Sequence, residues 1–334
     1  LHTIPLRFGV VTDIAPDIRL TLHNSGHILG ASMVHLHIGE GLHNIVYTSD
    51  YKFGRTMLLE AATTEFPRIE TVITESTYSG PDDIVPSRVE AEEALTNIIN
   101  KTLERKGKVL IPVPAVGRAQ EIMLVIDGYM KRGMMKEAPV FIEGMISEAT
   151  AIHTAYPEYL GREVRHSILH EEVNPFQSDY FTIVEHPSVR QSIIEGEPCI
   201  VLATSGMLEG GPVIEYFKNW ANDERNSIIF VSYQIEGTMG RRVQKGVNEV
   251  TMMDNEGKMA ALQVKMQVES IEGFSGHSDR RQLVNYLTHL TPKPERIFVV
   301  HGEKQKTLNF GNFLINKAGV NTVVPNVLET FRLL

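Results

Sequence analysis

Hydrophobic and polar positions alternate with a period of two in the first 80 residues. Residues 20–23 and 32–38 follow this pattern, and a glycine turn at 39–41 separates the second run from residues 44–48. Another apolar run covers residues 71–74. Because this period places alternate side chains on one face of a strand, the pattern predicts strands joined by tight turns.

After residue 80 the pattern changes to continuous apolar runs between helical segments. Residues 85–105, 117–131 and 211–221 have the spacing or charge pattern of helices. The apolar runs predict buried strands at residues 108–113, 198–203, 228–232 and 296–300. A further helix is predicted after the last strand. Strands that alternate with helices favour a parallel α/β sheet.

The composition is that of a globular protein. The chain has 334 residues, of which 42% are apolar and 22% charged, enough for two domains. No apolar run approaches the roughly 18 residues of a membrane span, and no signal peptide is recognisable. Cys199 is the single cysteine, which excludes an internal disulfide and a cysteine zinc cage and favours the cytoplasm. Because the chain starts with Leu1, we expect it to be part of something longer.

The net charge of −9 means that any contact with nucleic acid must come from local basic patches. Three patches qualify, at residues 241–245, 280–281 and 304–306. Taken alone, each is better explained as a solvated helix face.

Polar residues stand where predicted strands end. Asp50, Glu75 and His301 each follow an apolar run. In layered α/β folds, catalytic groups gather at the carboxyl ends of strands. Aspartate and histidine are also suitable ligands for Zn²⁺.

Four short segments carry the strongest chemical signal. They are 23–31 with His27 between two glycines, 47–50 ending in Asp50, 74–77 (Thr-Glu-Ser-Thr), and 274–279 (Phe-Ser-Gly-His-Ser-Asp) paired with 300–303 (Val-His-Gly-Glu). Their order and spacing resemble the β-CASP family of metallo-β-lactamase nucleases. Segments 113–120, 204–208 and 233–242 also look like that family, so the resemblance covers essentially the whole chain. It is nearest to archaeal relatives of the cleavage and polyadenylation specificity factor endonuclease.

The resemblance implies an α/β fold, in which a partial metallo-β-lactamase αββα fold carries an inserted β-CASP domain with a parallel sheet. The implied division places residues 1–79 in the metallo-β-lactamase domain and residues 80–272 in the β-CASP domain. Residues 273–334 would return to the first domain.

The resemblance also implies a site. His27, Asp50 and His301 match metal ligands of a two-zinc centre, and Asp50 would bridge the ions. The family's His-x-His-x-Asp-His motif is absent from the sequence, so we expect the remaining ligands in a segment that precedes residue 1. The run His35–Leu36–His37 has part of that spacing, but we interpret it as ordinary strand surface rather than ligands.

The implied chemistry is hydrolysis of a phosphodiester. The zinc ions would activate a water for attack on phosphorus, and Asp50, Glu75 and His277 are the catalytic candidates. His277 is the candidate general acid for the leaving 3′ oxygen, and Glu75 would orient it and keep it protonated. His301 occupies a position that favours RNA over DNA in this family, and the products would be a 3′ hydroxyl and a 5′ phosphate.

Further residues are candidates for phosphate contacts. The inserted domain would act as a lid over an unpaired strand of RNA. By resemblance, the contacts on the lid would come from Ser205, Gly206, Gln234, Thr238 and Arg241. Arg118 could hold a phosphate at a helix amino terminus. His23 is interpreted as a strand residue near the site, and the histidines without motif context as surface or hydrogen-bonded core residues: His43, His153, His166, His170, His186 and His289.

The prediction for function is therefore a zinc-dependent endoribonuclease of single-stranded RNA, which acts at transcript 3′ ends in transcription termination in an archaeon. Two alternatives stay open: a 5′-to-3′ exoribonuclease of the ribonuclease J kind, and a non-catalytic scaffold of RNA processing. The expected partners are single-stranded RNA, a second copy bound through the tail at residues 323–334, and RNA polymerase or a transcription complex.

Overall fold

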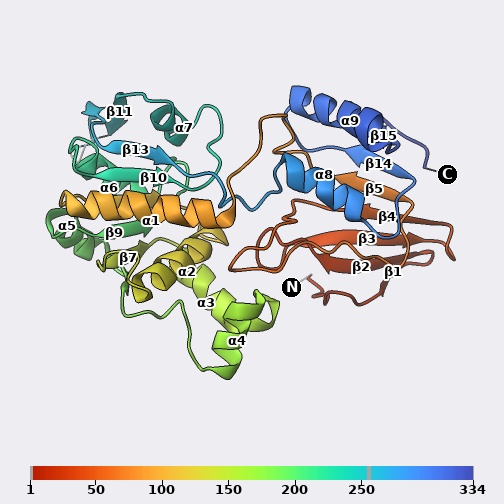
Figure 1. Cartoon of the computed structure of the whole chain (residues 1–334), viewed down its shortest axis with the longest axis horizontal. Helices are drawn as coiled ribbons and strands as arrows, with labels where there is room; N and C mark the ends of the chain where they lie inside the picture. The colour runs from red at the N-terminus through yellow and green to blue at the C-terminus, as the bar shows by residue number, and fades with distance from the viewer. Residues whose placement is uncertain (1–2, 254–256, 334) are drawn as a thin grey trace. The chain divides into compact units, whose positions relative to one another are not determined.

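The computed structural model describes residues 3–253 and 257–333 and divides the chain into two compact units (Figure 1). Unit 1 consists of residues 1–85 and 276–334, and unit 2 of residues 86–275. Both ends of the chain therefore fall in the same unit, and unit 2 is an insertion. In the part of the chain that the structure describes, no helix is long and apolar enough to cross a membrane.

Unit 1 is built on a mixed sheet in which seven strands lie in the order β1-β2-β3-β4-β5-β14-β15 among the described residues. The first four strands form an antiparallel meander, whereas β5, β14 and β15 run parallel to β4. The bounds are β1 Thr12–Ala15, β2 Ile18–Asn24, β3 Ser32–Ile38, β4 His43–Tyr47, β5 Thr71–Thr74, β14 Arg296–Val299 and β15 Thr322–Val323.

Two helices, α8 (Arg280–His289) and α9 (Lys304–Ala318), cover one face of this sheet. Asp279 caps α8 by accepting a hydrogen bond from the backbone N–H of Gln282. The apolar side of α8, with Leu283 and Tyr286, packs with Val46 and Val72 of the sheet in one buried core. This packing fixes the starts of both helices beside the ends of the central strands.

The opposite face of the sheet is apolar but only partly buried. Leu22, Leu36 and Ile45 point to this side because they alternate with the core-facing residues, and each is half-buried. Tyr47 is 43% exposed. A sheet with one covered face and one apolar, half-exposed face agrees with the expected partial layered fold.

Unit 2 contains a parallel sheet with the order β13-β10-β6-β9-β7-β8 and a separate hairpin, β11–β12. The strands are β6 Val109–Pro112, β7 Val140–Glu143, β8 Phe181–Ile183, β9 Ile200–Ala203, β10 Ser227–Phe230, β11 Glu249–Met253, β12 Met259–Gln263 and β13 Gln267–Ser270. The helices are α1 Arg88–Glu104, α2 Arg118–Lys131, α3 Ile146–Ala155, η1 Pro157–Tyr159, α4 Arg162–His170, α5 Pro187–Glu195, α6 Val213–Trp220 and α7 Met239–Gln244.

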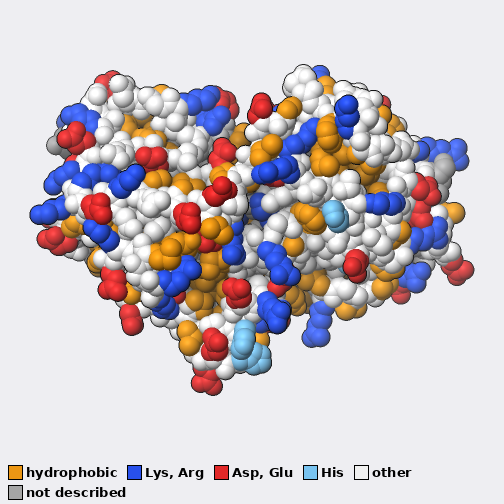
Figure 2. All heavy atoms as spheres, viewed as in Figure 1, with side chains coloured by type: hydrophobic (Ala, Val, Ile, Leu, Met, Phe, Trp, Pro, Cys, Tyr) orange, Lys and Arg blue, Asp and Glu red, His pale blue; other side chains and the backbone are white. Residues whose placement is uncertain are grey.

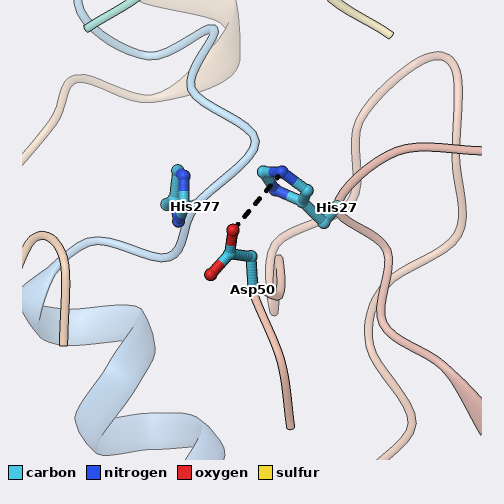
Figure 3. Close-up of side chains that lie close together, drawn as sticks. All are labelled: His27, Asp50 and His277. Atoms are coloured by element: carbon cyan, nitrogen blue, oxygen red, sulfur yellow. Dashed lines mark ion pairs between the residues drawn. The ribbon is translucent and has the colours of Figure 1, made fainter. Parts of the chain in front are cut away.

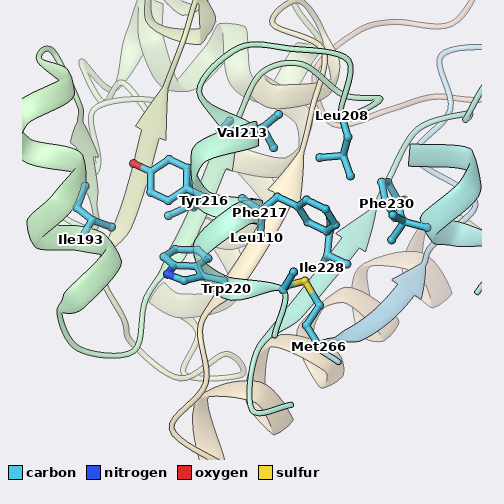
Figure 4. Close-up of a cluster of buried hydrophobic side chains, with 14 of the residues drawn as sticks. Leu110, Ile193, Leu208, Val213, Tyr216, Phe217, Trp220, Ile228, Phe230 and Met266 are labelled. Carbon is cyan, nitrogen blue, oxygen red and sulfur yellow. The ribbon is translucent and has the colours of Figure 1, made fainter. Parts of the chain in front are cut away.

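The central strands of unit 2 are buried on both faces, as parallel strands between helices must be. On one face, Leu110, Ile228 and Phe230 pack against Phe217 and Trp220 of α6 (Figure 4). The residues that alternate with them in these strands are also completely buried. This explains why the strands appear in the sequence as continuous apolar runs.

The predicted α/β class, with a parallel sheet in the inserted part, is confirmed. The strand predicted at 32–38 is β3 to the residue, and the helix predicted at 85–105 is α1, which begins at Arg88 after the capping box of Ser87 and Glu90. The elements between residues 140 and 195 and the strands β11 to β13 were not predicted. They are short, and apart from β7 they are largely or partly exposed, so their hydrophobic period is weak.

One interpretation is wrong. We expected His35 to be strand surface, but its side chain is completely buried. His35 Nε2 lies 3.0 Å from the carbonyl oxygen of Arg68, and its Nδ1 lies 3.3 Å from His23 Nε2. The loop that carries Phe66 covers this part of the sheet, and a contact so distant in sequence has no local signal.

Candidate metal and acid–base site

The loop between β2 and β3 presents His27. Gly26, with φ of +69°, allows the sharp turn, and a Cβ there would lie 2.8 Å from the carbonyl oxygen of Glu60 and 2.9 Å from that of Lys52. The chain therefore needs glycine beside this histidine, as the sequence pattern predicted.

One ring nitrogen of His27 is fixed by the backbone. Its Nδ1 lies 2.9 Å from the carbonyl oxygen of Gly276, to which it donates a hydrogen bond. The other ring nitrogen, Nε2, points toward Asp50 Oδ2, 3.9 Å away (Figure 3). Burial lowers the pKa of His27, so the ring is neutral near pH 7. A neutral imidazole whose other nitrogen binds a carbonyl is the usual state of a metal-ligating histidine.

Asp50 lies between two histidines just after β4. Its Oδ2 faces His27, and its Oδ1 is 3.2 Å from Nδ1 of His301. His301 follows β14, the strand that pairs with β5 in parallel. Neighbouring parallel strands thus bring Asp50, Glu75 and His301 to one edge of the sheet, where the strand-end argument expected them.

Glu75, which is buried, pairs with the partly exposed His277. His277 Nδ1 lies 3.0 Å from Oε1 and 2.9 Å from Oε2 of Glu75. Glu75 is 2% exposed and also accepts hydrogen bonds from the backbone N–H of Tyr51 and the hydroxyl of Thr77. Burial alone would raise the pKa of Glu75, but the hydrogen bonds and charge of His277, with these two donors, hold it below its ordinary value.

The loop that carries His277 is held in place by backbone contacts. Lys52, which is buried, donates from Nζ to the carbonyl oxygen of His277 at 2.8 Å. Ser278 Oγ accepts a hydrogen bond from the backbone N–H of Phe53 at 2.9 Å. Our sequence reasoning missed Lys52, and its only signal was its position two residues after Asp50.

Two groups of side chains at this site have the spacing and chemistry of a metal centre. His27, Asp50 and His277 form one, and Asp50, Glu75 and His301 form the other, each with ligand atoms within 4.8 Å of one another. Imidazole nitrogen and carboxylate oxygen are the donors that zinc accepts, and Asp50 is common to both groups. The residues therefore fit a metal site, but His277 belongs to one group although we expected it to act as an acid.

The candidate phosphate contacts lie in unit 2, near the ends of β9 and β10. Gln234 is buried, and its amide donates to the carbonyl oxygen of Gly206 at 2.9 Å. Thr238 caps α7, and Arg241 lies 3.5 Å from Glu236. Ser205 follows β9 and is half-buried.

Arg118 begins α2 but is only 7% exposed. Its phosphate-binding role therefore stays a prediction, as do those of the other candidate contacts.

Two family models match the chain. The Beta-Casp domain model covers residues 119–243, and the model of the Zn-dependent metallo-hydrolase RNA specificity domain covers residues 261–325. Curated relatives match 98–99% of the chain. The chain belongs to the metallo-β-lactamase/β-CASP family.

Within that family, the chain is 56% identical over 333 residues to Transcription termination factor FttA of Pyrococcus abyssi, covering 99% of this chain and 51% of the relative. It is 54% identical to the factor of the same name from Methanothermobacter thermautotrophicus (99% and 52%) and 51% identical to that from Lokiarchaeum sp. (98% and 52%). The chain thus spans about half the length of the curated relatives it matches.

Proposed function

We propose that the protein containing this chain is a zinc-dependent endoribonuclease that cleaves single-stranded RNA at transcript 3′ ends during transcription termination. The observation that carries the proposal is the Glu75–His277 pair beside Asp50 and His27. An oriented imidazole next to a candidate metal site suits the cleavage of a phosphodiester. The name of the FttA relatives supports the link with termination.

The two compact units support different roles for the two parts of the chain. We propose that unit 1 is the metallo-β-lactamase domain, which holds the cleavage chemistry, and that unit 2 is the β-CASP domain. The borders expected from the sequence were 79/80 and 272/273, and the compact units divide at 85/86 and 275/276. Ser205, Gly206, Gln234, Thr238, Arg241 and Arg118 remain proposed contacts for the RNA backbone.

The side chains of this chain would act as follows. His277 gives its Nε2 proton to the 3′ oxygen as the bond from that oxygen to phosphorus breaks, and water supplies the oxygen that joins phosphorus. Glu75 binds Nδ1 of His277 and so keeps Nε2 directed at the substrate. The products are a 3′ hydroxyl and a 5′ phosphate. His27, Asp50 and His301 would hold zinc, which when bound supplies Lewis acidity to activate water and stabilise negative charge.

A circular, single-stranded RNA tests this function in the full-length protein. An endonuclease opens the circle to a linear product, whereas a 5′-to-3′ exonuclease cannot begin on it. The new end should carry a 5′ phosphate, which a ligase accepts without prior kinase treatment. An intact circle together with degradation of the linear RNA would favour the exonuclease, and two intact RNAs would favour the scaffold.

We also propose that the protein forms a homodimer through residues 323–334 and acts together with RNA polymerase. Val327 and Leu328 in this tail are 94% and 96% exposed. Adjacent apolar side chains that are almost fully exposed are costly in water, and burial against a second copy would remove that cost.

A further inference from the structure

A groove of about 740 Å³ lies between α8 and α9 in unit 1. We propose that this groove binds a stretch of single-stranded RNA outside the cleavage site. The inference rests on the proposed function in one respect, since RNA is the polyanion that the site would cleave. The groove is not part of either candidate metal group.

The groove has the chemistry of an RNA backbone site. Arg281 stands on the α8 side and Lys317 on the α9 side, and both are exposed. Among the described residues that line it there is no aspartate or glutamate. Arg281 Nε lies 4.0 Å from Asp279 Oδ2, whose side chain is buried, so the guanidinium keeps exposed surface toward the groove. On a chain with a net charge of −9, a concave surface lined by cations and by no carboxylate would attract a polyanion.

The α9 side adds a row of amides. Asn309, Asn312 and Asn316 are spaced by three and four residues, which places them on one side of the helix, and all three are exposed. An amide can both donate to a phosphate oxygen and pair with the edge of an unpaired base. A surface that offers both amides and cations is therefore better suited to RNA than to an inorganic anion alone.

An aromatic ring, that of Phe313, is among the residues that line the groove. The guanidinium carbon of Arg280 lies 4.6 Å from the ring centre of Phe313 and 4.7 Å from that of Phe310. Arg280 also donates to the carbonyl oxygen of Ser79, so the position of this arginine is fixed. Phe313 is only partly buried, and its exposed part offers a surface on which a base can stack.

The two helices that form the groove begin shortly after two residues of the proposed cleavage site, His277 and His301. Arg280 follows His277 by three residues, and α9 begins at Lys304, three residues after His301. The match to the Zn-dependent metallo-hydrolase RNA specificity domain, at residues 261–325, includes both helices. In Figure 2, Lys and Arg side chains lie beside hydrophobic ones over α8 and α9. RNA held here would therefore be tied to the same elements that position the site.

Crosslinking and affinity measurements on the full-length protein test the groove. A 30-nucleotide RNA that contains 4-thiouridine is crosslinked, and the attached peptides are mapped by mass spectrometry. Affinity is measured by fluorescence anisotropy across a range of salt concentrations. The variants are Arg281→Glu/Lys317→Glu and the near-isosteric Asn312→Asp/Asn316→Asp. The matched control, Arg19→Glu/Lys101→Glu, makes the same charge change at exposed positions elsewhere.

We expect crosslinks on α8 and α9, and each groove variant should weaken binding roughly tenfold at low salt relative to the control. Loss of two phosphate contacts should also reduce the salt slope by about 1.4. Unchanged affinity and slope, with no crosslink on these helices, would overturn the proposal, and so would a groove that binds another protein instead.

Cleavage of a dinucleotide separates the two proposals. Its single phosphodiester must lie at the cleavage site, which leaves no phosphate for the groove, so the groove variants should cleave it normally. If the wild-type protein binds long RNA in the groove but cleaves neither substrate, the proposed function fails and the groove stands. If it cleaves both substrates and the groove variants bind long RNA normally, the groove fails and the proposed function stands.

Discussion

His277 Nδ1 binds both carboxylate oxygens of Glu75, at 3.0 and 2.9 Å, although 202 residues separate the two in sequence. Glu75 is 2% exposed and accepts further hydrogen bonds from Tyr51 and Thr77. Turning its carboxylate away from the imidazole would break these hydrogen bonds. The pair therefore fixes Nδ1 of His277 on Glu75, and the proposal assigns the proton transfer to Nε2.

His277→Ala in the full-length protein should lower kcat for RNA cleavage by roughly 10²- to 10⁴-fold, the usual contribution of a general acid. Glu75→Gln should lower it by about 10- to 100-fold, because the imidazole loses its orienting partner. A substrate with a 3′-bridging sulfur should restore much of the rate of His277→Ala, since a thiolate leaves without a proton. Failure of this rescue, with folding and zinc content intact, would contradict the role as acid.

Zinc content should distinguish the proposed ligands from the acid. Asp50 is common to both candidate metal groups, so Asp50→Asn should lose zinc, measured by inductively coupled plasma mass spectrometry after dialysis. His277→Ala should retain the wild-type amount, because the proposal gives the Nε2 of His277 a proton for the leaving oxygen and not a bond to zinc. His289→Ala, an exposed histidine outside both groups, is the control. Loss of zinc in His277→Ala would make His277 a ligand instead.

The sequence predicted much of this site because strand ends have local signals. Asp50, Glu75 and His301 each follow an apolar run, and parallel pairing of β5 with β14 brings two of those ends together. The partnership of Glu75 with His277 came from the family resemblance, because no local pattern connects residues so far apart. The burial of His35 could not be predicted for the same reason, since residues 66–70, which are distant in sequence, cover it.

The buried His35 should make the free energy of unfolding depend on pH in the acid range. Burial, followed by the charges of His37 and His23, lowers the pKa of His35 from 6.5 to about 4. The unfolded chain therefore binds the proton more tightly, so the stability contribution is complete above pH 6.5 and is lost as the pH falls toward 4. Between pH 7.5 and 5 the free energy of unfolding should fall by about 2 kcal/mol from this residue. His35→Gln, measured by urea unfolding, should show a correspondingly smaller fall, and an equal fall would remove His35 as the cause.

The exposed tail bears on the proposed dimer. Val327 and Leu328 are 94% and 96% exposed, whereas Phe331 packs its ring 5.2 Å from that of Phe298, so the two apolar residues lie on a segment attached to the sheet. If a second copy covers them, Val327→Ser/Leu328→Ser should convert a dimer to a monomer in light scattering at micromolar concentration. Ile4→Ser/Ile14→Ser, at exposed apolar positions elsewhere in unit 1, is the matched control and should remain dimeric. A wild-type protein that is monomeric at this concentration would contradict the dimer. A tail variant that stays dimeric would place the interface elsewhere. Because the proposed site lies within unit 1 of a single chain, the monomeric tail variant should still cleave short RNA at the wild-type rate.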